Sequence, residues 1–67
     1  MKLSKRFNNN LSNILAAYNG GPNNVDLWRN KFTGLDDDEF VENIPFKETN
    51  GYVKRVLRSY YYYKNNN

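Results

Sequence analysis

Apolar residues recur at helical spacing in four stretches of the chain, and no stretch shows the strict alternation expected of a strand. The first predicted helix covers residues 11–18. Its apolar face consists of Leu11, Ile14, Leu15 and Tyr18. Asn10 is suited to cap its start, because its side chain can accept a hydrogen bond from a free backbone amide. Asn19-Gly20-Gly21 is expected to end it, since glycine tolerates left-handed cap geometry.

Two further helices are predicted before Pro45. One runs from Pro22 or Asn23 to about residue 31, because proline suits a first helical turn. Its buried side consists of Val25, Trp28 and Phe32, and Trp28 is expected in the core beneath the first two helices. The other spans about residues 36–43. Its first turn carries Asp36, Asp37 and Asp38, where the helix dipole favours negative charge.

The fourth and longest helix is predicted over residues 47–63. Its apolar stripe consists of Val53, Val56, Leu57 and Tyr60, while Lys54, Arg55, Arg58 and Lys64 face solvent or a ligand. Asn50-Gly51 should weaken its first turn. Residues 60–63 are all tyrosine and cannot all be buried, because four consecutive positions circle a helix. We expect Tyr60 and one neighbour to pack. The pattern predicts an all-α domain of about four helices, with residues 64–67 as a disordered tail.

The amino-acid composition excludes several kinds of functional site and says less about the fold. A chain of 67 residues is at most one small domain of marginal stability. It contains no cysteine or histidine, so we expect no Cys/His metal site, no Ser-His-Asp triad and no cofactor. The net charge of +3 is spread along the chain. No stretch has the apolar length of a membrane span, and the basic N-terminus lacks the apolar core of a signal peptide.

The acidic residues are candidates for glycoside chemistry, which needs a carboxylic acid. Residues 36–39 are interpreted as a solvated helix start, and Glu42 as a surface residue or a partner for a base. Glu48 opens the last helix four residues before Tyr52, which places both on one face. Glu48 is either a carboxylate that favours the helix dipole or a residue that contacts a glycan or peptide in a groove.

Tyr18 and Asn19 at the end of the first helix also have two interpretations. One is a packed aromatic residue followed by a turn. The other is part of a sugar site, in which the phenol hydrogen-bonds a carboxylic acid and the asparagine amide binds an N-acetyl group. Such sites set a few polar groups in aromatic walls.

Two motifs suggest a family. The first is Ala16-Ala17-Tyr18-Asn19-Gly20-Gly21-Pro22, preceded by the loop Phe7-Asn8-Asn9-Asn10. The second is Ile44-Pro45-Phe46-Lys47-Glu48-Thr49, followed by Tyr52-Val53-Lys54-Arg55-Val56-Leu57. In this order, over about residues 7–63, they resemble the C-terminal half of the lysozyme-like catalytic domain of soluble lytic murein transglycosylases.

The resemblance implies a ligand and a set of residue roles. The family cleaves the bond between N-acetylmuramic acid and N-acetylglucosamine in peptidoglycan and leaves a 1,6-anhydro product, with one glutamate as acid and then base. Tyr18 would be an auxiliary beside that glutamate, and Asn19 would shape the same wall. Glu48 and Tyr52 would line the groove. The family acts in the periplasm or cell envelope.

The catalytic glutamate of the family lies upstream of the first motif, but none of the fifteen residues before Ala16 is acidic. The motif match already gives Glu39, Glu42 and Glu48 other positions. The chain alone is therefore expected to be inactive, because general acid catalysis worth about 10²–10⁴-fold is lost. It would be completed by a separate chain carrying the N-terminal half, or be a decayed remnant, or be a non-catalytic glycan-binding module. A small basic nucleic-acid binder is less favoured, since the last helix's outer face accounts for its basic side chains.

Overall fold

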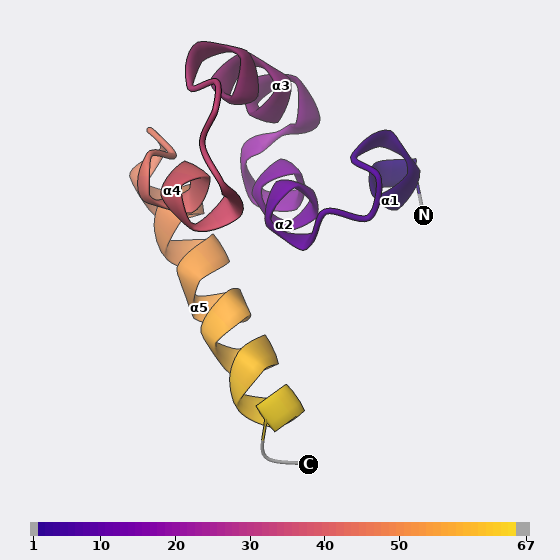
Figure 1. The fold of residues 1–67 in the computed structure, drawn as a ribbon, viewed down its shortest axis with the longest axis vertical. Coiled ribbons are helices and arrows are strands. Elements are labelled where there is room, and N and C mark those ends of the chain that lie inside the picture. The colour runs from indigo at the N-terminus through magenta and orange to yellow at the C-terminus, as the bar shows by residue number, and fades with distance from the viewer. Residues whose placement is uncertain (1, 66–67) are drawn as a thin grey trace.

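The computed structural model describes residues 2–65, which form five α-helices and no strand (Figure 1). The helices are α1 (Lys2–Arg6), α2 (Leu11–Gly20), α3 (Pro22–Lys31), α4 (Asp37–Glu42) and α5 (Lys47–Asn65). The predicted all-α fold is confirmed. The four helices expected from the apolar pattern correspond to α2–α5, whereas α1 was not expected.

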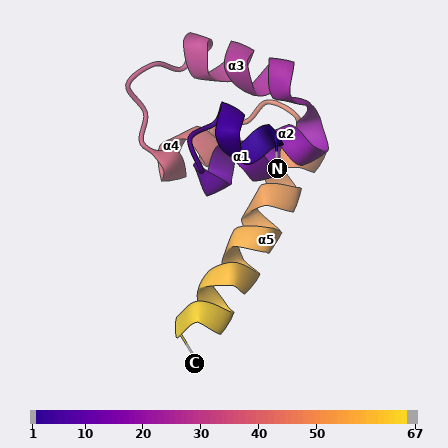
Figure 2. The ribbon, with the colours of Figure 1, turned by 90° about the vertical axis from the view of Figure 1, so that its right-hand side faces the viewer.

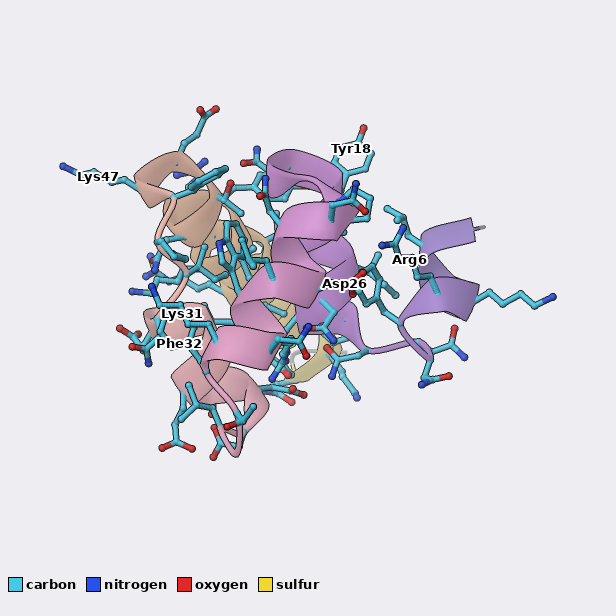
Figure 3. All side chains as sticks on the ribbon, turned by 90° about the horizontal axis from the view of Figure 1, so that it is seen from above. Arg6, Tyr18, Asp26, Lys31, Phe32 and Lys47 are labelled. Atoms are coloured by element: carbon cyan, nitrogen blue, oxygen red, sulfur yellow. The ribbon has the colours of Figure 1, made fainter. Side chains whose placement is uncertain are left out.

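Helix α1 is held by contacts with distant parts of the chain rather than by its own sequence. It is only five residues long, too short to be stable in isolation. Arg6 forms an ion pair with Asp26 of α3 and donates a hydrogen bond to Asn23 (Figure 3). Phe7 directly follows the helix and is buried. These long-range contacts explain why local periodicity gave no sign of α1.

The loop between α1 and α2 is the asparagine run predicted to be irregular. Asn8 and Asn9 adopt positive φ angles of 54° and 62°, a conformation that asparagine tolerates better than most residues. The predicted cap is confirmed, since the Asn10 side chain accepts a hydrogen bond from the backbone N–H of Asn13 at 2.9 Å.

Helix α2 ends two residues later than predicted. Gly20 is still helical, and the chain turns at Gly21, whose φ is +98°. The Gly21 N–H bonds to the Ala17 carbonyl, and the Asn24 side chain donates to the Gly20 carbonyl at 2.8 Å. Since α3 begins at Pro22, this single residue separates the two helices.

The core lies where α2, α3, α4 and the first half of α5 meet. Trp28 is buried as predicted, with 4% of its surface exposed, and Phe46 packs edge-on against it. The buried apolar residues are Phe7, Ala16, Ala17, Val25, Trp28, Phe40, Val41, Ile44 and Val53. They extend along the chain from Phe7 to Val53 and form one core cluster.

Helix α4 is tied to α5 by polar side chains. Asp36 caps α4 in a reciprocal arrangement with Glu39, at 2.9 and 3.1 Å. Asn50 donates to the backbone carbonyls of Val41 and Ile44 at 2.9 and 3.2 Å. Asn50-Gly51, expected to weaken the first turn of α5, lies within the continuous helix, and Asn50 anchors the end of α4.

The second half of α5 projects away from the other helices (Figures 1 and 2). Tyr60, Tyr61, Tyr62 and Tyr63 are all exposed, by 44% to 69%. The expectation that Tyr60 and a neighbour would be packed is therefore wrong, because all four rings keep about half or more of their surface exposed. Lys64 and Asn65 of the predicted tail are helical, since nothing after Tyr63 breaks the helix. Residues 66–67 of that tail lie outside the described residues.

Candidate functional site

The two motifs of the sequence meet at a junction between the end of α2 and the start of α5. Tyr18 and Tyr52 stack there, with ring centroids 6.4 Å apart and planes inclined by 19°. Tyr18 is 70% exposed and projects from the end of α2 (Figure 3), whereas Tyr52 is half-buried against the core. One tyrosine anchors the pair and the other presents its surface to solvent.

The other two predicted site residues lie at the same junction. Asn19 is exposed, and its Oδ1 accepts a hydrogen bond of 2.8 Å from the hydroxyl of Thr49. Glu48 precedes Thr49 in the first turn of α5 and is exposed. Within residues 2–65, its carboxylate makes no hydrogen bond or ion pair. It is therefore available to a ligand, in a position that the helix dipole favours for an anion.

Gly20 allows the two helices to approach so closely. A Cβ atom at this position would lie 2.9 Å from Thr49 Oγ1 and 3.1 Å from Cη2 of Trp28. Contacts under 3.0 Å are closer than real Cβ atoms tolerate, so any larger residue would force the helices apart. Gly20 thus matters for the close packing of the two helices, whereas the chain turns at Gly21.

The junction offers the chemistry of sugar binding. An exposed phenol ring supplies an apolar flat surface, an amide supplies a hydrogen-bond donor and acceptor, and a free carboxylate accepts hydrogen bonds from hydroxyl groups. A small number of polar groups beside an aromatic surface is typical of a small-molecule site. All four side chains predicted as site residues lie on these two helix ends. Sequence reasoning missed Thr49, although it directly follows Glu48 in the second motif.

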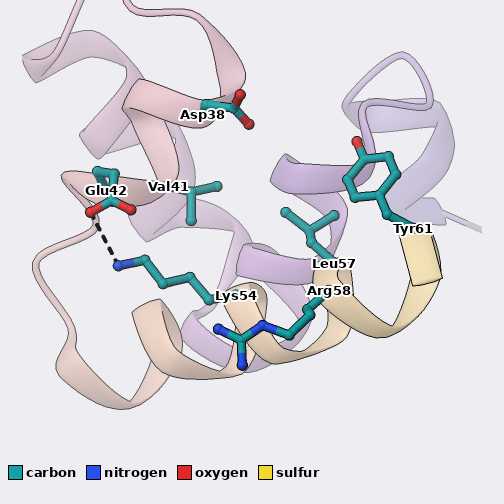
Figure 4. A pocket seen from close by; sticks show the side chains of 7 residues that line it. All are labelled: Asp38, Val41, Glu42, Lys54, Leu57, Arg58 and Tyr61. Carbon is teal, nitrogen blue, oxygen red and sulfur yellow. Dashed lines mark hydrogen bonds and ion pairs between the residues drawn. The ribbon is translucent and has the colours of Figure 1, made fainter.

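A separate hollow lies between α4 and the middle of α5 (Figure 4). Its volume is about 360 Å³, and it is lined by Asp38, Val41, Glu42, Lys54, Leu57, Arg58 and Tyr61. Lys54 crosses it to form an ion pair with Glu42 at 3.1 Å, as expected for Glu42. This pair is solvated and contributes little. None of the four predicted site residues lines the hollow, so we locate the candidate site at the tyrosine pair.

One carboxylate outside the junction has an altered pKa. The Asn10 side chain donates a hydrogen bond to Asp37 and lowers the pKa of that carboxyl below its ordinary value of 3.8. Partial burial opposes this shift, while Arg29, bonded to Asp37 at 2.9 Å, adds to it. Asp37 therefore holds together the start of α2, the end of α3 and α4, which makes it a structural rather than a site residue.

Across residues 2–65, no three carboxylate, histidine or cysteine side chains gather as metal ligands would. In the same residues, no helix combines the length and the apolar character needed to cross a membrane.

Comparison with known proteins matches the two motifs to one family. The Transglycosylase SLT domain family matches residues 1–41. Soluble lytic murein transglycosylases of Salmonella typhimurium and Escherichia coli K12 are each 48% identical over 61 residues, which is 90% of this chain and 10% of theirs. A Haemophilus influenzae relative is 45% identical over 64 residues, covering 94% of this chain and 11% of its own.

The chain thus spans about a tenth of the length of the curated relatives it matches. No solved structure gives a significant match. The match of residues 1–41 includes the first motif, and the alignments with the relatives extend over nearly the whole chain. The chain belongs to the Transglycosylase SLT domain family, whose domain is lysozyme-like.

Proposed function

We propose that this chain forms one wall of a peptidoglycan-binding groove, with Tyr18, Asn19, Glu48 and Tyr52 as its glycan contacts. The stacking of exposed Tyr18 on anchored Tyr52, with ring centroids 6.4 Å apart, carries the proposal. It joins residues of two separate motifs into one surface with a free carboxylate and an amide. A sugar ring placed on Tyr18 would find both polar groups on the neighbouring helix ends.

The reaction that this wall would serve is cleavage between N-acetylmuramic acid and N-acetylglucosamine with a 1,6-anhydro product. That reaction needs a carboxylic acid that donates a proton to the leaving oxygen and then takes one back. No acidic residue precedes the first motif, since the first acidic residue of the chain is Asp26. Glu48 is proposed above as a glycan contact rather than as this acid. The 67 residues alone would therefore bind glycan without cleaving it, and Tyr18 would assist an acid supplied by another segment or chain.

Binding of an N-acetylglucosamine tetramer, followed by amide NMR, tests the proposal. We expect resonances of Tyr18, Asn19 and Glu48 to shift, and Tyr18→Ala to weaken binding by about tenfold. Tyr63→Ala is a matched control, because Tyr63 is 69% exposed but lies at the far end of α5. Equal weakening by both variants, or no binding by the wild-type chain, would contradict the proposed site.

The proposed inactivity of the chain alone needs its own assay. Purified murein incubated with the 67-residue chain should release no anhydromuropeptides. Release above that of a heat-denatured sample would show that the chain contains its own acid, and this part of the proposal would be abandoned while the binding site remained.

A further inference from the structure

The hydroxyl of Thr49 is the one polar group of the junction that a ligand cannot reach. Thr49 is only 2% exposed, and its Oγ1 donates to Oδ1 of Asn19 at 2.8 Å. Among residues 2–65, this asparagine oxygen is the only acceptor of that hydroxyl hydrogen. A buried side chain of α5 thus controls the amide of an exposed side chain on α2.

This hydrogen bond determines which end of the amide faces a ligand. The Asn19 oxygen accepts from Thr49, which leaves the Nδ2 group of this exposed side chain, without a hydrogen bond in residues 2–65, to donate to a ligand. If the amide flipped, the buried hydroxyl hydrogen would lose its acceptor, and an unsatisfied buried donor is costly. The arrangement therefore favours Asn19 as a hydrogen-bond donor at the surface.

The position of Thr49 is itself closely fixed. The bare Cα of Gly20 faces it, and a Cβ atom there would lie 2.9 Å from Oγ1 and 3.1 Å from Cγ2. Both the hydroxyl and the methyl group are therefore in contact with the end of α2. Thr49 has little room to rotate, so its hydrogen bond to Asn19 is preorganised before any ligand arrives.

We infer that Thr49 is a positioning residue that orients Asn19 to donate from Nδ2 to the carbonyl oxygen of an N-acetyl group on the glycan. The inference rests on the proposed function and adds a specificity to it. A donor at the surface selects a ligand with an acceptor at that point, and the acetamido carbonyl is the strong acceptor that distinguishes amino sugars from plain glucose units. The chain should therefore discriminate at carbon 2 of the sugar.

The test compares two neutral tetramers with the same β-1,4 linkage, one of N-acetylglucosamine and one of glucose. The wild-type chain should bind the acetylated tetramer about three- to tenfold more tightly, which is the effect of one good hydrogen bond. Thr49→Val keeps the shape of the side chain but lacks the hydroxyl, and should lose most of this preference. Thr49→Ser keeps the hydroxyl and should retain it.

A second variant keeps the inference testable if Thr49→Val fails to fold. Asn19→Asp leaves an oxygen to accept from Thr49 but replaces the outward donor with an acceptor, at an exposed position where folding should be unaffected. It should bind the acetylated tetramer no better than the glucose tetramer. The side-chain amide resonances of wild-type Asn19 should shift with the acetylated tetramer only.

The outcomes separate the inference from the proposed function. A wild-type chain that binds neither tetramer contradicts the proposed function itself. A wild-type chain that binds, with Thr49→Val weakened equally for both tetramers, would reduce Thr49 to a packing residue. An unchanged preference in Thr49→Val or in Asn19→Asp would overturn the assigned orientation.

Discussion

The guanidinium group of Arg29 lies over the ring of Phe40, with its central carbon 3.7 Å from the ring centroid. Phe40 is fully buried, so this cation covers one face of a core aromatic residue. The same side chain donates from Nε to Asn13 at 2.8 Å and from Nη2 to Asp37 at 2.9 Å. One arginine of α3 thus joins α2 and α4.

Replacing Arg29 should therefore destabilise the fold more than replacing an exposed arginine. Lysine cannot reproduce the planar stack and the two directed hydrogen bonds. We expect Arg29→Lys to lower the free energy of unfolding by about 1–2 kcal/mol, measured by urea denaturation followed by circular dichroism. Arg58→Lys, at an exposed position without a hydrogen bond or ion pair in residues 2–65, is the control and should change it little. If both variants changed the free energy of unfolding equally, the stack of Arg29 on Phe40 would contribute nothing to stability.

Asp37 should make the stability depend on pH. Because the folded state lowers its pKa, ionised Asp37 stabilises the fold above its ordinary pKa of 3.8. That contribution is lost as the pH falls below 3.8 through the folded pKa. Asp37→Asn should therefore destabilise the chain at pH 7 and matter less at pH 2.5.

Urea denaturation at the two pH values measures this difference. Asp38→Asn is the matched control, because Asp38 lies next to Asp37 in α4 but makes no hydrogen bond or ion pair in the described chain. At pH 7 its effect should be the smaller of the two. If Asp37→Asn lowered the free energy of unfolding equally at both pH values, the role assigned to Asn10 and Arg29 would be contradicted.

Replacement by alanine should change the stability of the fold in opposite directions at Gly20 and at Gly51. Both lie within helices, where alanine is ordinarily preferred by roughly 0.5–1 kcal/mol. At Gly51 the nearest group is Nη1 of Arg55, 3.2 Å from the added Cβ, and this flexible end can move. Gly51→Ala should therefore stabilise the fold by about that amount.

At Gly20 the added methyl would meet Thr49 and Trp28, which are both buried and cannot move aside. Gly20→Ala should destabilise the fold by about 1–3 kcal/mol, as overpacking does. It should also shift the NMR resonances of Asn19. If Gly20→Ala were as stable as Gly51→Ala, the close approach of α2 and α5 would be refuted.

The sequence predicted those features that depend on neighbouring residues. Periodicity and local capping chemistry located every end of α2 to α5 to within two residues, including the Asn10 cap and a start of α3 at Pro22 or Asn23. It also placed Trp28 in the core. In each case the signal lies within a few positions of the element it describes.

Features that depend on distant contacts were missed. Helix α1 forms because Arg6 and Phe7 find partners in α3 and the core, and no local pattern shows this. At the candidate site, the motifs named the four residues, but not that Tyr18 stacks on Tyr52 or that Thr49 orients Asn19. Those relationships are set by the packing of α2 against α5, which spacing along the chain does not encode.

The two halves of α5 should differ in local stability. Thr49 and Val53 in the first half are buried, whereas every residue from Arg58 to Asn65 is exposed. A helix end with little buried surface opens readily, because most helical stability in proteins comes from packing. Amide hydrogen exchange of residues 60–65 should therefore be fast and that of residues 50–56 slow. Uniform protection of the amides along α5 would instead mean that the four tyrosines are covered in solution. If this protection then decreased on dilution of the protein, self-association would be the cause.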